Sequence, residues 1–127
     1  MSRQATYFKE KYKTDVAFRA AIKNRVKAWN LSIEGRCKRA LSQSKRNARI
    51  AGYEPINATW RELAEALENQ NYCCAITGIS ELDLIGRLHA DHDHTTGKFR
   101  GWICPRANTA LGFIEPFSKQ IDIYLKG

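Results

Sequence analysis

All three histidines of this chain fall within six positions, and aspartates are interleaved with them: residues 88–94 read LHADHDH. In an extended strand that bends into a loop, alternate residues share a face, so Asp91 can face a metal ion while His92 is directed toward water. A carboxylate is a suitable ligand for Mg²⁺, and an imidazole titrates near neutral pH and can accept a proton from water. The run therefore predicts a strand end that carries the chemistry of phosphodiester hydrolysis.

Short segments on either side of the histidines predict a β-hairpin. Residues 87–91 and 98–103 are spaced to pair as antiparallel strands around a loop centred on residues 94–97. Glycines punctuate this half of the chain and favour turns and strands over long helices. We therefore expect the histidines to lie at the end of the first strand and in the loop.

A helix is expected directly after the hairpin. Pro105 suits the first turn of a helix that carries Asn108 and ends near Gly112. Such a helix would return Asn108 beside Asp91, where its amide oxygen is a reasonable ligand for Mg²⁺, and a solvated helix residue is the alternative interpretation of Asn108 alone. A last short helix over residues 117–125 is expected to pack inward through Ile121, Tyr124 and Leu125.

Residues before the hairpin are predicted to be helical. Apolar residues recur every three or four positions over residues 14–29, and a second helical stretch over residues 33–50 ends near Gly52. Thr59 and Glu62 fit a capping box at the start of a third helix that runs to about residue 70.

Charge divides the chain into two parts. Residues 1–50 contain 14 Lys and Arg against 3 Asp and Glu, whereas residues 51–127 contain 7 against 10. Because Lys and Arg neutralise phosphates, this asymmetry favours a polyanion-binding arm joined to a separate module, and a solvated helix surface is the alternative. The candidate contacts in the arm are Arg36, Lys38, Arg39, Lys45, Arg46 and Arg49.

Some classes of protein are disfavoured by the sequence. No apolar run approaches the roughly 20 residues of a membrane span, and the first residues lack the apolar stretch of a secretory signal. Four irregularly spaced cysteines, two of them adjacent, fit a reduced chain better than a disulfide scaffold. We expect one compact cytoplasmic protein without a membrane partner.

Two motifs together carry a family resemblance. Residues 74–78 (CAITG) and residues 88–112, from the histidine run to Gly112, closely resemble phage recombination endonuclease VII, a nuclease of the His-Me finger or HNH-like class. The resemblance covers roughly residues 72–114. It implies an α+β fold in which basic helices precede a ββα-metal finger and a short C-terminal helix, divided as an arm over residues 1–58 and a nuclease module over residues 59–127.

The resemblance also implies roles for individual residues. Asp91 and Asn108 would bind one Mg²⁺ or Mn²⁺, His92 would be the general base, His94 would assist at the phosphate, and His89 would support the site. The implied activity is hydrolysis of phosphodiester bonds in double-stranded or branched DNA. A phage origin, the host cytoplasm and a homodimer are further implications. The hairpin would contribute two contacts to DNA phosphates, Lys98 and Arg100, and a surface arginine without such a contact is the alternative interpretation of Arg100.

This sequence departs from the family pattern in two places. The family usually has four zinc-binding cysteines, and the matching positions here are Cys74, Thr77, Cys104 and Ala107. Because Thr and Ala cannot replace thiolates, we expect no structural zinc. A zinc site rescued by Cys37 or Cys73, or a disulfide between Cys74 and Cys104, stays open. Leu111 stands where some members have a glutamate that supports the metal. Without zinc, the finger would be held by packing of Cys74, Ile76, Cys104 and Ala107 against Trp102 and Leu111.

Other interpretations of the histidine run remain. The histidines could form a structural zinc site or belong to a solvated polar loop, although imidazoles on alternate faces do not easily converge on one ion. A non-catalytic DNA-binding protein that retains the nuclease fold is the main alternative function. A zinc-stabilised interaction module is the other.

Overall fold

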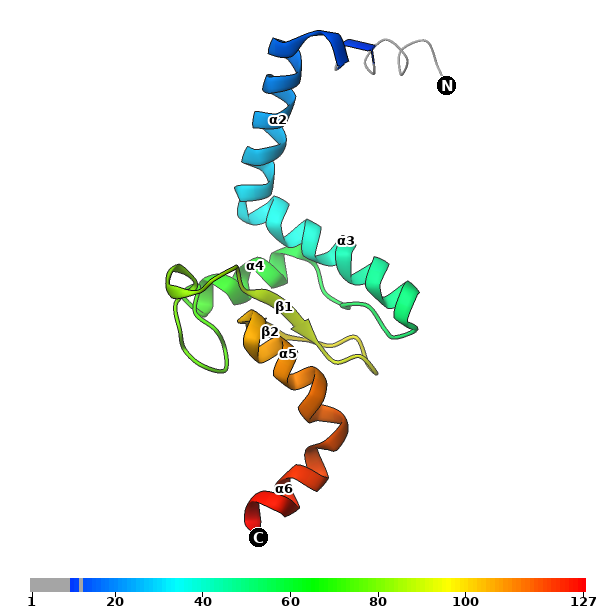
Figure 1. The fold of residues 1–127 in the computed structure, drawn as a ribbon, viewed down its shortest axis with the longest axis vertical. Coiled ribbons are helices and arrows are strands. Elements are labelled where there is room, and N and C mark those ends of the chain that lie inside the picture. Colours follow the sequence, from blue (N-terminus) through cyan, green and yellow to red (C-terminus); the bar gives the residue numbers. More distant parts are fainter. Residues whose placement is uncertain (1–9, 12) are drawn as a thin grey trace.

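The computed structural model describes residues 10, 11 and 13–127, so the first nine residues of the expected arm lie outside the described part of the chain. A two-stranded antiparallel sheet lies among α-helices, which confirms the predicted α+β class. Helices α2 and α6 project from opposite sides of a central body (Figure 1). The elements are α2 (Val16–Leu31), α3 (Ile33–Ala51), α4 (Trp60–Asn69), β1 (His89–His92), β2 (Phe99–Ile103), α5 (Pro105–Ile114) and α6 (Ser118–Lys126), with 3₁₀ turns at Glu81–Asp83 and Glu115–Phe117.

Local capping explains where the first helices begin and end. The Asp15 carboxylate accepts a hydrogen bond from the Phe18 amide at the start of α2, and the Ser32 hydroxyl accepts one from the Gly35 amide at the start of α3. Gly52 ends α3 in a left-handed conformation, and Thr59 and Glu62 form the predicted capping box of α4. The predicted extents of these helices are therefore confirmed to within about two residues.

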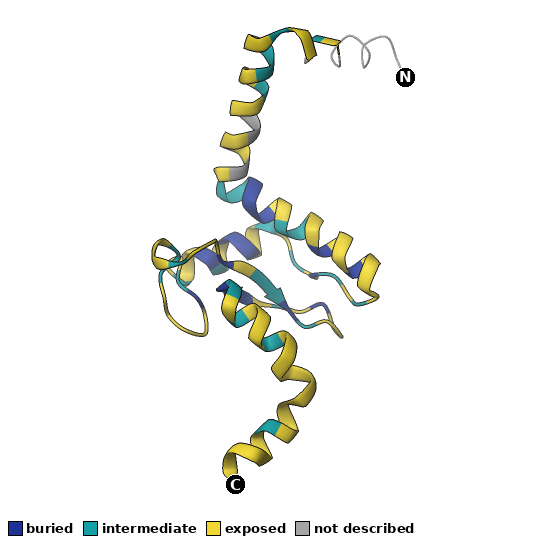
Figure 2. Ribbon diagram, viewed as in Figure 1, coloured by how far each residue is buried: buried dark blue, intermediate teal, exposed yellow. Residues whose placement is uncertain are grey.

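The core lies where α4 packs against β2 and α3 packs against α4, and most of α2 and α6 is exposed (Figure 2). Trp102 of β2 is fully buried, and its indole N–H donates to the backbone oxygen of Leu63 at 2.8 Å. The buried hydrophobic residues are Cys37, Ile56, Leu63, Ala64, Leu67, Cys74, Leu88, Trp102, Ile103 and Cys104.

No helix among the described residues has the length and apolar character to cross a membrane.

An irregular pairing in the hairpin shapes the site. Asp91 pairs with Gly101 and His92 pairs with Phe99, so Arg100 is an extra residue opposite the Asp91–His92 step. Gly101 has φ of 145°, a conformation that other residues rarely adopt. The sheet is therefore bulged where the predicted chemical residues stand, and β1 includes His92, whereas the sequence predicted a strand over residues 87–91.

The C-terminal part differs from the expectation. Helix α5 continues through Gly112 to Ile114 and leads through the 3₁₀ turn into α6, since Gly112 keeps helical geometry. The predicted inward packing of α6 is wrong for Tyr124 and Leu125, which are 83% and 75% exposed, and only Ile121 is half-buried. The physical reason is position, because α6 lies beyond the core (Figure 1).

Candidate active site

A polar pocket of about 350 Å³ lies between the hairpin and α3. Its lining includes Asp91, His92 and His94 from the hairpin side and Asn108 from α5. Neighbouring residues in a regular strand point to opposite faces, so the bulge explains how Asp91 and His92 reach one pocket. His89 also lines it. The structure thus brings together the five residues that the sequence singled out for catalysis and metal binding.

His92 is held by a backbone group from a distant part of the chain. Its Nε2 lies 2.9 Å from the carbonyl oxygen of Glu54, and the side chain is only 6% exposed. Because a carbonyl oxygen can only accept, Nε2 carries a proton in this contact, and in the corresponding neutral tautomer Nδ1 is the acceptor nitrogen. The imidazole therefore has one nitrogen anchored and one nitrogen available as a base.

The segment from Glu54 to Asn57 lies along the hairpin loop. The Glu54 amide donates to the backbone oxygen of His94 at 3.0 Å, and the Asn57 amide donates to that of Gly97 at 2.7 Å. Gly97 has φ of 79°, and a Cβ atom there would lie 2.5 Å from the Pro55 carbonyl oxygen. Glycine is therefore required for this close approach, which places the Glu54 carbonyl beside His92.

Tyr53 fixes the second histidine of the pocket. Its ring stacks on that of His94 with centroids 4.0 Å apart and planes 4° from parallel. It also lies 5.7 Å from the ring of His92, and the two imidazoles are 4.9 Å apart. Stacking restricts the His94 ring, so this exposed histidine keeps a defined orientation at the pocket.

Asp91 and Asp93 have different surroundings. Asp93 accepts hydrogen bonds from the Thr96 and Thr95 amides, which lower the pKa of its carboxyl group and stabilise the loop. Asp91 is bound by Arg100, whose Nε and Nη2 donate to its two oxygens at 2.8 and 3.1 Å. Nη2 of Arg100 also donates to Glu115 at 2.7 Å, and the hydrogen bonds to Asp91 and Glu115 raise the pKa of the guanidinium. In the structure, Arg100 therefore binds carboxylates at the place where the sequence suggested a phosphate contact.

The donor chemistry of the pocket fits a hard divalent cation. Asp91 offers a carboxylate and Asn108 an amide oxygen, and both line the same pocket. No group of three or more His, Cys, Asp or Glu surrounds a common point among the residues that the structure describes. Mg²⁺ commonly takes one or two protein ligands and completes its shell with water and phosphate oxygens, so two oxygen donors are sufficient.

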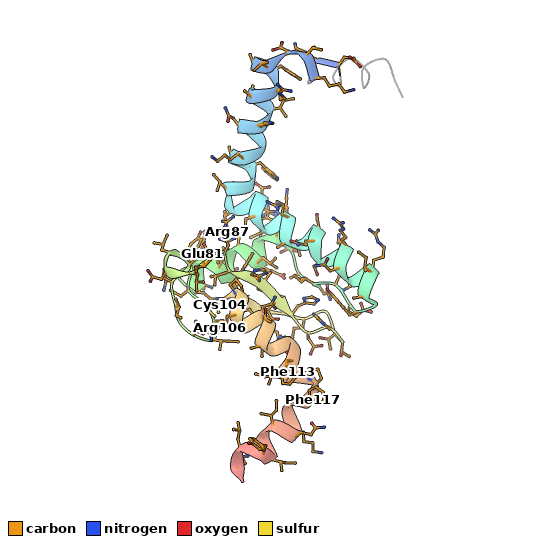
Figure 3. The ribbon with its side chains drawn as sticks, viewed as in Figure 1. Glu81, Arg87, Cys104, Arg106, Phe113 and Phe117 are labelled. Carbon is orange, nitrogen blue, oxygen red and sulfur yellow. The ribbon has the colours of Figure 1, made fainter. Side chains whose placement is uncertain are left out.

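Arg36 was predicted to belong to the DNA-binding cationic surface of α3, but it is buried. Its guanidinium is 8% exposed, pairs with the Glu81 carboxylate, and donates to the Leu88 backbone oxygen at 3.2 Å. It also lies 5.0 Å from the centroid of the Trp102 ring. Position 36 falls on the face of α3 that packs against the hairpin, so this arginine joins α3 to the loop before β1, where Glu81 and Arg87 lie (Figure 3).

The other predicted cations remain on the surface. Lys38 pairs with Glu34 at 2.9 Å and lies near the Trp29 and Trp60 rings, and Lys98 is exposed at the hairpin. The same face of α3 that contributes Arg36 to the pocket also contributes Arg39, Gln43 and Asn47. The remaining exposed cations of α3 are Lys45, Arg46 and Arg49.

The two remaining finger cysteines accept backbone hydrogen bonds. Cys74 Sγ accepts from the Thr77 and Cys104 amides at 3.4 and 3.3 Å, and Cys104 Sγ accepts from the Ala107 amide at 3.4 Å. Burial raises the pKa of Cys74, but the hydrogen bonds from Thr77, Cys104 and Ile76 outweigh it and lower the pKa to about 6. All four cysteines are free thiols. Cys74, Cys104 and Trp102 pack as predicted with Ala107 and Leu111, but Ile76 is 58% exposed.

The sequence did not point to several residues of the site. Tyr53 lines the pocket and Glu54 supplies the carbonyl that holds His92, but both belong to a segment with the composition of a connecting turn, and a backbone carbonyl has no sequence signature. Gln43 and Asn47 are uncharged, so the charge pattern of α3 did not indicate them. Their spacing of four residues on α3 was the available signal, because it places them on one helix face with Arg39.

A β-hairpin followed directly by a helix, with carboxylate, imidazole and amide groups gathered in one pocket, defines a ββα nuclease-like finger. A family model described as recombination endonuclease VII matches residues 42–126. The chain therefore belongs to the recombination endonuclease VII family, as the motifs predicted, and it is a nuclease that acts on DNA. Comparison with curated proteins and with solved structures gave no match.

Proposed function

We propose that the protein is a Mg²⁺- or Mn²⁺-dependent endonuclease that hydrolyses phosphodiester bonds of DNA. The observation that carries this proposal is the anchored imidazole of His92 in the same pocket as Asp91 and Asn108. The pocket combines a base with a pair of oxygen donors, which is the minimum that metal-assisted phosphodiester hydrolysis requires.

His92 is the general base of this reaction. Its Nε2–H is held by the Glu54 carbonyl, so Nδ1 accepts a proton from the attacking water. The carbonyl also stabilises the imidazolium that forms, because an N–H bond to an acceptor strengthens when the donor is charged. Positioned general bases typically contribute about 10²- to 10⁴-fold to rate.

Asp91 and Asn108 would hold the divalent cation beside His92. When bound there, the cation would supply Lewis-acid stabilisation of the charge that develops on the phosphate and on the leaving oxygen. His94, kept in orientation by Tyr53, would donate to a phosphate oxygen, and His89 would support the phosphate at the edge of the pocket. No further acid or base among the pocket residues is needed for this chemistry.

DNA would approach along α3. Arg39 lies on the pocket side of this helix, and three further exposed cations lie along it at Lys45, Arg46 and Arg49. Arg39 would neutralise a phosphate beside the scissile bond, and the cations on the other faces of α3 would add contacts to phosphates farther along the DNA. Lys98 of the hairpin would add a contact from the other side. Double-stranded or branched DNA is the proposed substrate, and a homodimer is the proposed assembly for paired cuts.

A cleavage panel tests this function. Supercoiled, linear, single-stranded and four-way-junction DNA are incubated with purified protein and Mg²⁺, Mn²⁺ or a chelator, and the cut positions are mapped. We expect cleavage with either metal, none with the chelator, and strong loss in His92→Ala. Lys119→Ala, a change of an exposed residue on α6, is the matched control and should cleave normally.

The same panel separates the alternative function. A non-catalytic DNA-binding protein would bind the DNA in a salt-dependent way but leave every substrate intact. Intact DNA with both metals would therefore overturn the proposal even if binding were tight.

A further inference from the structure

Asp91, Arg100 and Glu115 form a chain of ion pairs beside the proposed catalytic pocket. Arg100 binds both oxygens of Asp91 and, through Nη2, one oxygen of Glu115. Glu115 lies in the turn after α5, so the chain of contacts links the C-terminal part of the molecule to β1. We propose that Arg100 and Glu115 are positioning residues that set the orientation and charge of the metal-binding carboxylate of Asp91. This inference rests on the proposed function.

Asp91 lies between two pockets, and Arg100 approaches it from only one of them. The catalytic pocket is lined by Asp91 with the histidines and Asn108, whereas a second pocket is lined by Asp91, Arg100 and Glu115. A carboxylate has about four lone-pair sites, so binding of Arg100 on one side leaves lone pairs for a cation on the other. The guanidinium can therefore hold Asp91 without displacing a metal ion from it.

The two hydrogen bonds from Arg100 to Asp91 depend on the shape of the guanidinium as well as on its charge. The planar guanidinium donates two nearly parallel hydrogen bonds to one carboxylate, which fixes the plane of that carboxylate as well as its position. Arg100 is the extra residue of the bulge, and Asp91 is only 12% exposed. A lysine has the same charge but cannot form this fork, so charge and geometry can be separated by substitution.

Charge explains why Glu115 is needed. Arg100 alone would neutralise Asp91 and weaken its attraction for a divalent cation. Glu115 returns the three-residue group to a net formal charge of −1. Removing one unit charge from the neighbourhood of a divalent ion in a largely solvated site changes the affinity for that ion by about threefold to tenfold.

The rival role for Arg100 is a direct contact with DNA phosphate. A phosphate contact would strengthen DNA binding and would have no influence on a metal ion in the absence of DNA. The positioning role predicts effects on metal affinity without DNA and on the maximal cleavage rate with DNA. The two roles therefore differ in readouts that can be measured separately.

The test is a Mn²⁺ titration by calorimetry without DNA, together with kcat and KM for cleavage. Glu115→Gln should bind Mn²⁺ about threefold to tenfold more weakly, whereas Arg100→Gln should bind it more tightly by a similar factor. Arg100→Lys should keep nearly the parental affinity but, like Arg100→Gln, lose kcat rather than raise KM. Asp122→Asn removes an ion pair to Lys126 far from Asp91 and is the matched control, expected to change neither quantity.

The possible outcomes are distinct. Unchanged Mn²⁺ affinity in both Glu115→Gln and Arg100→Gln, with a raised KM for Arg100→Gln, would overturn the positioning role and leave the proposed function intact. A parent protein that neither binds Mn²⁺ nor cleaves DNA would overturn both proposals. Thermal denaturation of each variant shows that the comparison is made between folded proteins.

Discussion

Nε2 of His92 lies 2.9 Å from the carbonyl oxygen of Glu54, a residue 38 positions earlier in the chain. This contact fixes which imidazole nitrogen is free, and it depends on a segment with no chemical motif of its own. The hydrogen bonds from Glu54 and Asn57 to the hairpin loop hold that segment in place. The candidate catalytic base is therefore oriented by the turn after α3 as well as by its own strand.

Tyr53 should support DNA cleavage through the ring that stacks on His94, and its hydroxyl should not contribute. Tyr53→Phe keeps the stack on His94, so cleavage should remain close to the parental rate. Tyr53→Ala removes the stack, and because aromatic pairs contribute about 0.5–1.5 kcal/mol, the rate should fall by roughly twofold to tenfold. Single-turnover cleavage of supercoiled DNA measures both variants, and equal losses in the two would contradict the stacking role.

Arg36 and Arg39 are expected to have opposite phenotypes although they lie on one face of α3. Arg36→Met leaves Glu81 half-buried without its partner and should lower the free energy of unfolding by about 3 kcal/mol. Arg39→Gln should leave the free energy of unfolding unchanged. It should reduce the slope of log K for DNA binding against the logarithm of the salt concentration by about one, because it removes one phosphate contact. Chemical denaturation and a salt series of DNA-binding measurements would detect these effects. A stable Arg36→Met variant with weakened DNA binding would contradict the buried role.

The sequence predicted the helices and the hairpin well, because these follow from local signals. The capping box at Thr59 and the helix start at Pro105 are each set by a few neighbouring residues. The site residues were identified from their motif, whereas the bulge that brings Asp91 and His92 to one pocket has no local signal in the sequence. The roles predicted for the site residues are not tested by these contacts and stay predictions.

What the sequence could not provide depends on contacts between distant residues. The burial of Arg36 follows from Glu81, 45 positions away, and the charge pattern of α3 alone gave no reason to separate it from Arg39. The ion pairs of Arg100 depend on the bulge and on the continuation of α5 past Gly112. The exposure of Tyr124 and Leu125 follows from where the core ends, which helical periodicity does not encode.

We predict that the purified protein contains far less than one zinc ion per chain. Thr77 and Ala107 occupy positions where a zinc finger of this family needs thiolates, and neither can ligate the metal. Elemental analysis measures the zinc content, and a chelator should leave the melting temperature unchanged. One zinc per chain, with a melting temperature that falls on chelation, would contradict the prediction; loss of that zinc in Cys37→Ala or Cys73→Ala would identify the rescuing ligand.

Cys74 should make the stability of the finger pH-dependent. The pKa of its thiol is lowered from 9.0 to about 6 in the folded protein. A lowered pKa means that the folded state favours the thiolate, so this stabilisation is full above the unfolded pKa and is lost as the pH falls through about 6. The difference in unfolding free energy between the parent and Cys74→Ala should therefore increase from pH 6 to pH 9. A difference in unfolding free energy that stays constant from pH 6 to pH 9 would contradict the claim that the folded state favours the Cys74 thiolate.

The most direct test of the central claim is the single-turnover cleavage rate of His92→Ala at saturating DNA and Mg²⁺. His92→Gln serves as a second, less disruptive variant, and melting temperatures of both show whether the fold is kept. We predict a loss of about 10²- to 10⁴-fold in rate with unchanged affinity for DNA, because the base is removed and the binding surface remains. A folded variant that cleaves DNA at the parental rate would contradict the assignment of His92 as the catalytic base.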